Sequence, residues 1–208
     1  MTAEKRKEFR AYGIRVLLSR HPAIRKLKRQ NFPTSHGNRF WTSSWLLMDY
    51  FSHHGLARRT RVMEIGCGWG TAGIHCAKKF GALVTGVDID ADVFPFAKLH
   101  ADLNKVHITF MKKGFDGIGA AHLKDIDVLI GADICFWDEM VDPLRRLILR
   151  AMRAGAKLVL IADPVRSPFE ELCEYFKDKP GAEVLNRSVK RPRNIRGQIL
   201  KVTKLQKN

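Results

Sequence analysis

One stretch, residues 62–79, constrains the fold more than any other part of this sequence. An apolar run, Val-Met-Glu-Ile, leads directly into a Gly-x-Gly-x-Gly turn at residues 66–70, and a helical pattern follows over residues 71–79. Glycines allow a sharp turn and a close approach of a ligand to the backbone, while the start of a helix offers free N–H groups and a positive dipole end. The stretch therefore predicts a strand, a tight turn and a helix whose start suits a carboxylate.

The rest of the chain repeats this alternation of strands and helices. Helical segments separate five short apolar runs, at residues 61–65, 83–87, 107–111, 127–131 and 157–162. Such alternation is typical of a parallel sheet with helical crossovers. Two further strand-like runs, 183–189 and 198–205, have no helix between them and predict an antiparallel hairpin. We therefore expect a doubly wound α/β fold with a mostly parallel, seven-stranded sheet that ends in an antiparallel hairpin.

The first 40 residues predict a basic helical extension and a linker, before a main domain at residues 41–208. Phe9, Tyr12 and Val16 lie at helical spacing and predict a helix over residues 4–19, and Pro22 opens a second, short helix. A linker rich in Asn, Pro, Ser and Gly is expected at residues 31–38, followed by an apolar helix at 43–51.

Two later helices carry recognisable start signals. Ser167, followed by Pro168 and Glu170, predicts a capping box at the start of one helix. Asp138 is expected to open another helix, and Gly155 is expected to end it.

Positive charge is concentrated at both ends of the chain. The sequence has 37 Lys and Arg against 21 Asp and Glu, a formal net charge of +16. Residues 1–31 contribute +8 and residues 187–208 another +8, so the middle of the chain is neutral. Basic ends of this kind either engage an acidic surface, such as RNA, an acidic protein or anionic lipid, or form a solvated face that aids solubility.

Other features limit the class of protein. No apolar run approaches the roughly 18 residues of a membrane span, and the charged start does not resemble a signal peptide. The four cysteines form no C-x-x-C pair, so neither a zinc site nor a disulfide framework is predicted. We expect reduced thiols, no metal site and a cytoplasmic location, while the sequence gives no indication of oligomeric state.

The glycine-rich turn admits two cofactors. Asp88 follows Glu64 by 24 residues and ends the next strand, where a carboxylate can accept hydrogen bonds from both ribose hydroxyls. Gly68, Gly70 and Gly73 also satisfy the dinucleotide fingerprint, with Asp88 as the ribose acid. Glu64 two residues before the first glycine, the long leader and the terminal hairpin together favour S-adenosylmethionine.

Two further motifs carry a resemblance to a known family. Trp41-x-x-x-Trp45 precedes the apolar helix, and Ala-Asp-Ile-Cys-Phe at residues 132–136 ends the fourth strand of the main pattern. With the glycine turn, these motifs make residues 41–176 resemble the class I, seven-β-strand methyltransferases. Within that class, the closest resemblance is to the protein-lysine branch that includes the electron-transfer flavoprotein β-subunit lysine methyltransferases and their bacterial relatives. Phe136 stands where that branch often has tyrosine.

The resemblance implies a cofactor site and a transfer site. S-adenosylmethionine is expected to contact Trp45, Glu64, Gly66, Cys67, Gly68, Trp69, Gly70, Asp88, Ile89, Asp116 and Ala132. Asp116 is assigned to the adenine amine, with Phe115 as the alternative. At the transfer site, Asp133 is expected to orient the acceptor amine, and Phe136 and Trp137 to wall the channel. The alternative role for Asp133 is to cap the helix near Asp138 or to bind loop amides.

Three functions remain open at this point. The resemblance implies an enzyme that methylates a protein lysine or a similar amine. An RNA methyltransferase could use the basic ends to bind phosphates. A cofactor-binding protein without catalytic activity is the third, and the intact glycine turn with Asp88 argues against it.

Overall fold

A seven-stranded sheet forms the centre of the protein. The computed structural model describes residues 7–33 and 36–203. The strand order is β5-β4-β3-β6-β7-β9-β8, in which neighbours among the first five strands are parallel and both pairs that involve β9 are antiparallel. The strands are β3 (Arg61–Ile65), β4 (Leu83–Asp88), β5 (Ile108–Lys112), β6 (Val128–Ala132), β7 (Leu158–Asp163), β8 (Ala182–Val189) and β9 (Ile195–Thr203). The predicted fold class is confirmed, and residues 204–205 of the last predicted strand lie outside the described residues.

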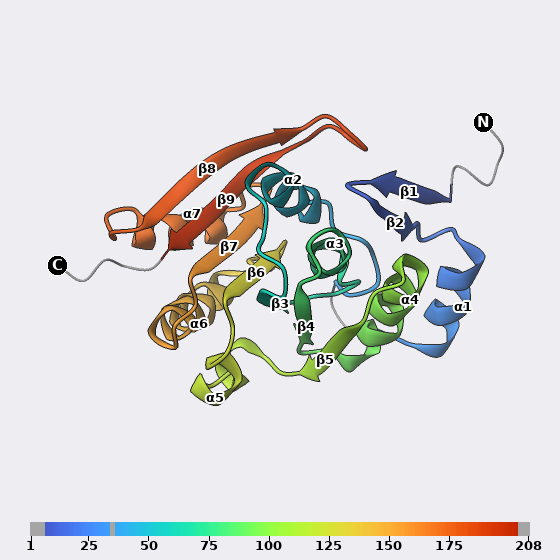
Figure 1. Ribbon diagram of the computed structural model, residues 1–208, viewed down its shortest axis with the longest axis horizontal. Coiled ribbons are helices and arrows are strands. Elements are labelled where there is room, and N and C mark those ends of the chain that lie inside the picture. Colours follow the sequence, from blue (N-terminus) through green and yellow to red (C-terminus); the bar gives the residue numbers. More distant parts are fainter. Residues whose placement is uncertain (1–6, 34–35, 204–208) are drawn as a thin grey trace.

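Helices cover both faces of this sheet (Figure 1). One face carries α2 (Ser44–His54), α3 (Thr71–Phe80) and α4 (Phe94–Asn104), and the other carries α5 (Ala120–Leu123), α6 (Val141–Arg153) and α7 (Ser167–Phe176). Successive residues of a strand point to opposite faces, so Val62 and Met63 enter two different apolar clusters. Burial on both faces explains why these strands are continuous apolar runs in the sequence.

The N-terminal segment differs from its prediction. The helix expected over residues 4–19 is wrong, since the described part of it forms a hairpin of β1 (Glu8–Ala11) and β2 (Ile14–Leu17). Tyr12 and Gly13 make the turn with φ values of 53° and 77°, the positive values that a two-residue hairpin turn requires. The helix predicted from Pro22 is confirmed as α1 (Pro22–Gln30).

This segment is packed into the main body. Ile14, Val16, Leu17 and Ile24 are buried, and the backbone N–H of Leu17 donates to His100 of α4. The tip of the β8–β9 hairpin also reaches β1, because the Arg193 guanidinium lies 5.6 Å from the ring centre of Phe9. Arg193 of the C-terminal basic segment therefore contacts Phe9 of the N-terminal basic segment.

The helices on the other face begin differently from their predicted starts. Ser167 is the first residue of α7 and makes no side-chain cap, so the predicted capping box is wrong. Arg166 occupies the cap position because its side chain is held by two carboxylates of the site described below. A single 3-10 turn at Asp138–Met140 precedes α6, and Gly155 follows its end with a φ of 106°.

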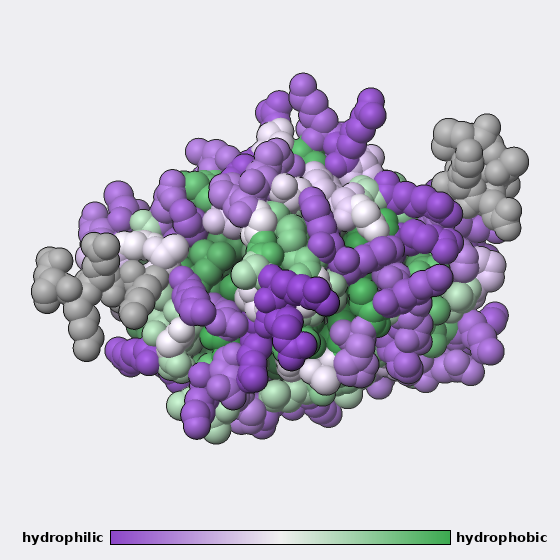
Figure 2. All heavy atoms as spheres, in the orientation of Figure 1, coloured by the Kyte–Doolittle hydropathy of each residue, from purple (hydrophilic) through white to green (hydrophobic). Residues whose placement is uncertain are grey.

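The surface is mostly polar on the side seen in Figure 2, where hydrophilic side chains separate smaller hydrophobic patches. Among the described residues, no helix combines the length and apolar character needed to cross a membrane.

Candidate active site

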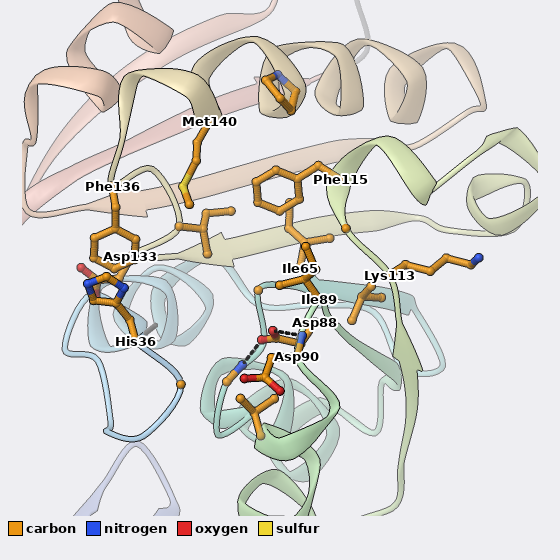
Figure 3. Close-up of a pocket in the computed structure, with 18 of the residues that line it drawn as sticks. His36, Ile65, Asp88, Ile89, Asp90, Lys113, Phe115, Asp133, Phe136 and Met140 are labelled. Carbon is orange, nitrogen blue, oxygen red and sulfur yellow. Dashed lines mark hydrogen bonds between the residues drawn. The ribbon is translucent and has the colours of Figure 1, made fainter. Parts of the chain in front are cut away.

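A cavity of about 470 Å³ opens at the carboxyl ends of β3, β4 and β6. Its lining includes Ile65 at the end of β3, Asp88 at the end of β4 and Ala132 at the end of β6. In a doubly wound sheet, ligands bind at this edge, where successive crossovers leave in opposite directions. Figure 3 shows His36, Asp133 and Phe136 at one end of the cavity and Ile89, Phe115 and Lys113 at the other.

The glycine-rich turn forms the floor of this cavity. Gly66 and Gly68 line it, with φ values of 56° and 50°. A Cβ atom on Gly66 would lie 2.5 Å from Cγ2 of Ile134, so a side chain there would collide with the segment that follows β6. The turn then leads into α3, whose N-cap residue, Gly70, makes no side-chain cap.

Glu64 lies behind the turn and does not line the cavity. Its carboxyl group is buried, and Oε2 accepts the backbone N–H of Gly73 at 2.9 Å. Burial raises the pKa of Glu64 to about 8. A Cβ atom on Gly73 would lie 2.6 Å from this oxygen, so only glycine lets α3 approach β3 this closely. Glu64 therefore fixes the first turn of α3 against β3.

Because the folded-state pKa of Glu64 exceeds its ordinary value of 4.5, its contribution to stability is present at low pH and is lost as the pH rises toward 8. We expect the free energy of unfolding to fall between pH 5 and pH 9 by about 1–3 kcal/mol more in the parent than in Glu64→Gln. The variant keeps the oxygen that accepts from Gly73 but does not ionise. Urea unfolding at both pH values measures this. Glu183→Gln, an exposed control, should follow the parent, and equal slopes for the parent and Glu64→Gln would contradict the assignment.

Asp88 places a carboxylate inside the cavity. Oδ2 accepts the N–H of Gly68 at 2.9 Å and Oδ1 accepts the N–H of Asp90 at 3.1 Å (Figure 3). Burial raises the pKa of Asp88 above its ordinary value. The two backbone bonds fix the side chain and leave further lone pairs for a ligand.

A network of two buried carboxylates and one arginine lies behind the β6 end of the cavity. Oδ1 of Asp133 accepts from Arg166 at 2.9 Å, and Oδ2 accepts the N–H of Ser43 at 2.8 Å. Arg166 also donates to Oδ2 of Asp163 at 2.6 Å, while its backbone N–H donates to Oδ1 of Asp163 at 2.8 Å. Burial raises the pKa of Asp163, although the adjacent Arg166 opposes that shift. One guanidinium thus holds the ends of β6 and β7 together.

Aromatic rings stand in front of this network. Phe136 lies between the ring of His36, 4.4 Å away and nearly parallel, and the guanidinium of Arg166, 4.3 Å away. Trp41 packs against Phe136 at 4.9 Å and donates its Nε1–H to the carbonyl oxygen of His36. His36, Trp41 and Phe136 all line the cavity, so they form an aromatic wall at its β6 end.

The structure brings together eight of the predicted site residues. The cavity lining includes Gly66, Gly68, Asp88, Ile89, Asp116, Ala132, Asp133 and Phe136. Six others lie outside this lining: Trp45, Glu64, Cys67, Trp69, Gly70 and Trp137. Trp45 is fully buried against Phe40, Trp69 stacks on Phe96, and Trp137 is 55% exposed.

Sequence reasoning did not single out several residues of the lining. His36, Lys113, Glu139 and Met140 belong to it, and they come from loops or from the 3-10 turn before α6. Phe115, the predicted alternative to Asp116, lines the cavity together with it, and Asp116 pairs with Arg146 at 3.2 Å. Arg166 was not predicted either. Its role follows from its ion pairs with Asp133 and with Asp163, the last residue of β7.

Part of the chain is similar to known methyltransferases. Residues 62–155 match a family described as a methyltransferase domain. A ubiquinone biosynthesis O-methyltransferase from Neisseria meningitidis is 38% identical over 61 residues, which is 29% of this chain and 26% of that protein. The matched segment thus spans about a quarter of the curated relative's length.

Solved structures share the fold at low sequence identity. A precorrin-6y C5,15-methyltransferase from Geobacter metallireducens has a TM-score of 0.61 and 13% identity, over 89% of this chain and all of that one. An RNA methyltransferase from Salinibacter ruber, solved with S-adenosyl-L-homocysteine, has a TM-score of 0.57 and 13% identity, over 81% of this chain and 96% of the other. The fold is the α/β fold of class I methyltransferases.

Proposed function

We propose that this chain binds S-adenosylmethionine in the cavity and transfers its methyl group to the side-chain amine of a protein lysine. The methyltransferase-domain match over residues 62–155 and the solved relative with S-adenosyl-L-homocysteine support the cofactor. The geometry supports it too, because the cavity volume suits a small organic ligand and a glycine turn lines it.

The residues present fit this cofactor. The backbone at Gly66 and Gly68, beside the start of α3, suits its carboxylate. Asp88 suits the ribose hydroxyls, and Ile89 and Phe115 provide apolar surface for the adenine. When bound, the group supplies an electrophilic methyl on a positively charged sulfur.

The charge of the cavity lining is the observation that supports an amine as the methyl acceptor. The described lining contains one lysine, Lys113, against five acidic side chains, Asp88, Asp90, Asp116, Asp133 and Glu139. Figure 3 shows the Lys113 side chain extending away from the other labelled residues. Arg146 and Arg166, from outside the lining, pair with Asp116 and Asp133, but the acidic side chains still outnumber these two arginines and Lys113. The remaining negative charge favours both a sulfonium ligand and an amine that arrives as ammonium.

Transfer itself requires the uncharged amine. A lysine with an ordinary pKa near 10.4 is only about 0.04% neutral at pH 7, which corresponds to roughly 4.6 kcal/mol. A carboxylate alone at the transfer site would favour the ammonium, but Arg166 is 2.9 Å from Asp133 and partly cancels its charge. The paired Asp133 and Arg166 therefore permit proton loss to water before attack, while the aromatic wall orients the amine.

Asp133 acts here as a positioning residue, since its two oxygens hold Arg166 and the N–H of Ser43. We expect Asp133→Asn to lower turnover by about tenfold through a misplaced acceptor, with S-adenosylmethionine affinity within about twofold of the parent. Radiolabel transfer and calorimetry measure the two quantities. The pH profile should also shift, because the charge balance around the amine changes.

Asp138→Asn provides the matched control, because Asp138 is exposed, lies nearby and does not line the cavity. Its turnover and pH profile should equal those of the parent. Parent-like turnover in Asp133→Asn with intact cofactor binding would remove Asp133 from the mechanism.

The acceptor class can be tested directly. Purified protein is incubated with radiolabelled S-adenosylmethionine and a cell extract, and the products are divided between protease and ribonuclease treatment. Label that resists ribonuclease, is removed by protease and is recovered as methyl-lysine supports the proposal. Label removed by ribonuclease would favour RNA as the acceptor instead.

We also propose a domain organisation and a cellular location for this protein. We assign residues 1–40 to the extension and 41–208 to the methyltransferase domain. We also assign the enzyme to the cytoplasm, in keeping with four buried, free cysteines, Cys67, Cys76, Cys135 and Cys173.

A further inference from the structure

A basic face lies on α1, outside the cavity. Residues 9–48 contain no aspartate or glutamate, and α1 lies within this stretch. Arg25 and Arg29 are four residues apart, and Lys26 and Arg29 are three apart, so these cations share one face of the helix. All three are exposed, and none forms an ion pair with an acidic residue within residues 7–33 and 36–203. This face of α1 therefore carries three uncompensated positive charges.

The surroundings of α1 leave the basic face open. The neighbouring helix α4 contains one acidic residue, Asp102, which pairs with Lys98 of the same helix at 3.1 Å. Figure 1 shows α1 at the edge of the molecule, beside α4. The apolar side of α1 is already used, because Ile24 is fully buried and packs with Trp69 and Phe96. A helix that lies in a membrane surface must place its apolar side in the lipid, so α1 is not suited to that role.

An aromatic ring follows this basic face. Asn31 ends α1, and its backbone N–H and side-chain amide both donate to the carbonyl oxygen of Leu27, at 2.8 and 3.0 Å. Phe32 then donates its backbone N–H to Oδ2 of Asp92 at 3.0 Å. Phe32 is nevertheless 73% exposed, the largest fraction for any large hydrophobic residue in the described part of the chain. Its backbone is therefore held in place while its ring faces solvent, within about 10 Å of Arg29 along the chain.

We propose that the basic face of α1 and Phe32 bind a single-stranded nucleic acid, with the cations on phosphates and the ring stacked on a base. Proteins that bind single strands combine a positively charged track with aromatic rings that accept any base. An acidic protein segment would match the charge, but its carboxylates offer no flat surface for stacking. The single negative charge of Asp92 does not balance the three cations.

This inference goes beyond the proposed function and does not depend on it. The nucleic acid is a binding partner and not the methyl acceptor, because the acid-rich cavity disfavours phosphates.

Fluorescence anisotropy of a labelled, short uridine oligonucleotide with the full chain tests the proposal. Each phosphate contact of a single strand contributes about −0.7 to the slope of log affinity against log salt concentration, so three contacts predict a slope of about −2. Arg25→Gln/Arg29→Gln should reduce the slope to about −0.7 and weaken binding by about tenfold or more at low salt. Arg25→Lys/Arg29→Lys should keep the affinity within about twofold, because lysine also binds phosphate. A thymidine oligonucleotide distinguishes DNA from RNA, and binding of either supports the proposal.

Variants of Phe32 separate stacking from charge. Phe32→Leu keeps an apolar side chain but loses the ring, so it should weaken binding by about tenfold while the salt slope stays unchanged. Phe32→Tyr should bind like the parent. Parent-like binding of Phe32→Leu would overturn the stacking role.

Lys124→Gln/Arg153→Gln is the matched control, since it removes two exposed cations beside α5 and α6, on the other face of the sheet. It should bind within about twofold of the parent. An equal loss in this control would mean that only net charge matters, and tighter, α1-dependent binding of a polyglutamate peptide would identify an acidic protein as the partner. Either result would overturn the proposal, as would absent binding of both oligonucleotides. Calorimetry with S-adenosylmethionine tests the proposed function separately, so the two can fail independently.

Discussion

Replacing Asp88 with alanine is expected to weaken S-adenosylmethionine binding by about a hundredfold or more. A charged acceptor contributes about 1.5–3 kcal/mol for each hydrogen bond, and the ribose offers two hydroxyls. The backbone bonds from Gly68 and Asp90 hold this carboxylate at the cavity wall, so water cannot easily replace it. Calorimetric titration of the purified variant measures the effect.

The control for Asp88 is Asp102→Ala, which removes an exposed aspartate that pairs with Lys98 on α4. It should bind the cofactor like the parent. Thermal unfolding of Asp88→Ala shows whether the glycine turn survives loss of the Gly68 bond. Parent-like affinity in a folded Asp88→Ala protein would mean that the ribose lies elsewhere.

Replacing Arg166 with methionine is expected to cause the largest loss of stability, about 2–4 kcal/mol, together with a loss of turnover greater than that of Asp133→Asn. The side chains of Asp133 and Asp163 are 3% and 0% exposed, and removing their shared cation leaves two uncompensated buried carboxylates. Arg166 is itself 24% exposed, which places the expected cost toward the lower part of the range for buried pairs. Urea unfolding and radiolabel transfer measure the two losses.

The pH dependence of Arg166→Met has a definite sign. Without the guanidinium, the pKa of Asp163 should rise further above its ordinary value, so its contribution to stability is present at low pH and is lost as the pH rises. The variant should therefore be closer to the parent at pH 5 than at pH 8. Adding Asp163→Asn should restore part of the lost stability. Arg146→Met, which removes the partner of the exposed Asp116, should cost less than about 1 kcal/mol, and an equal cost for Arg166→Met would contradict the network.

The sheet and the glycine turn could be predicted because their signals are local. Each parallel strand is a short apolar run, and the turn at residues 66–70 consists of a short, contiguous Gly-x-Gly-x-Gly motif. The β1–β2 hairpin could not, because Phe9, Tyr12 and Val16 also fall at helical spacing. The hairpin depends on the positive φ values of Tyr12 and Gly13 at its turn. Ile14 and Val16, alternate residues of the second strand, are both buried.

The cavity residues that could be predicted from the sequence lie at or near the ends of predicted strands. Gly66, Gly68 and Asp88 follow directly from strand ends, whereas His36 and Arg166 reach the site from segments that lie far from these residues in the sequence. Even neighbours in the glycine turn differ, since Trp69 is buried against Phe96 while Gly68 lines the cavity. Contacts of this kind depend on tertiary packing.

The position of β9 between β7 and β8 has a consequence for the order in which the molecule can assemble during synthesis. The ribosome makes β8 before β9, yet β8 has no partner in the main sheet until β9 has paired with β7. Such late, long-range pairing is slow relative to local folding. The cavity edge formed by β3, β4 and β6 can therefore appear while the chain is still being made, whereas the outer edge of the sheet is complete only after residues 195–203 have emerged. A nascent chain would form the cavity that we propose for the cofactor before its sheet is complete.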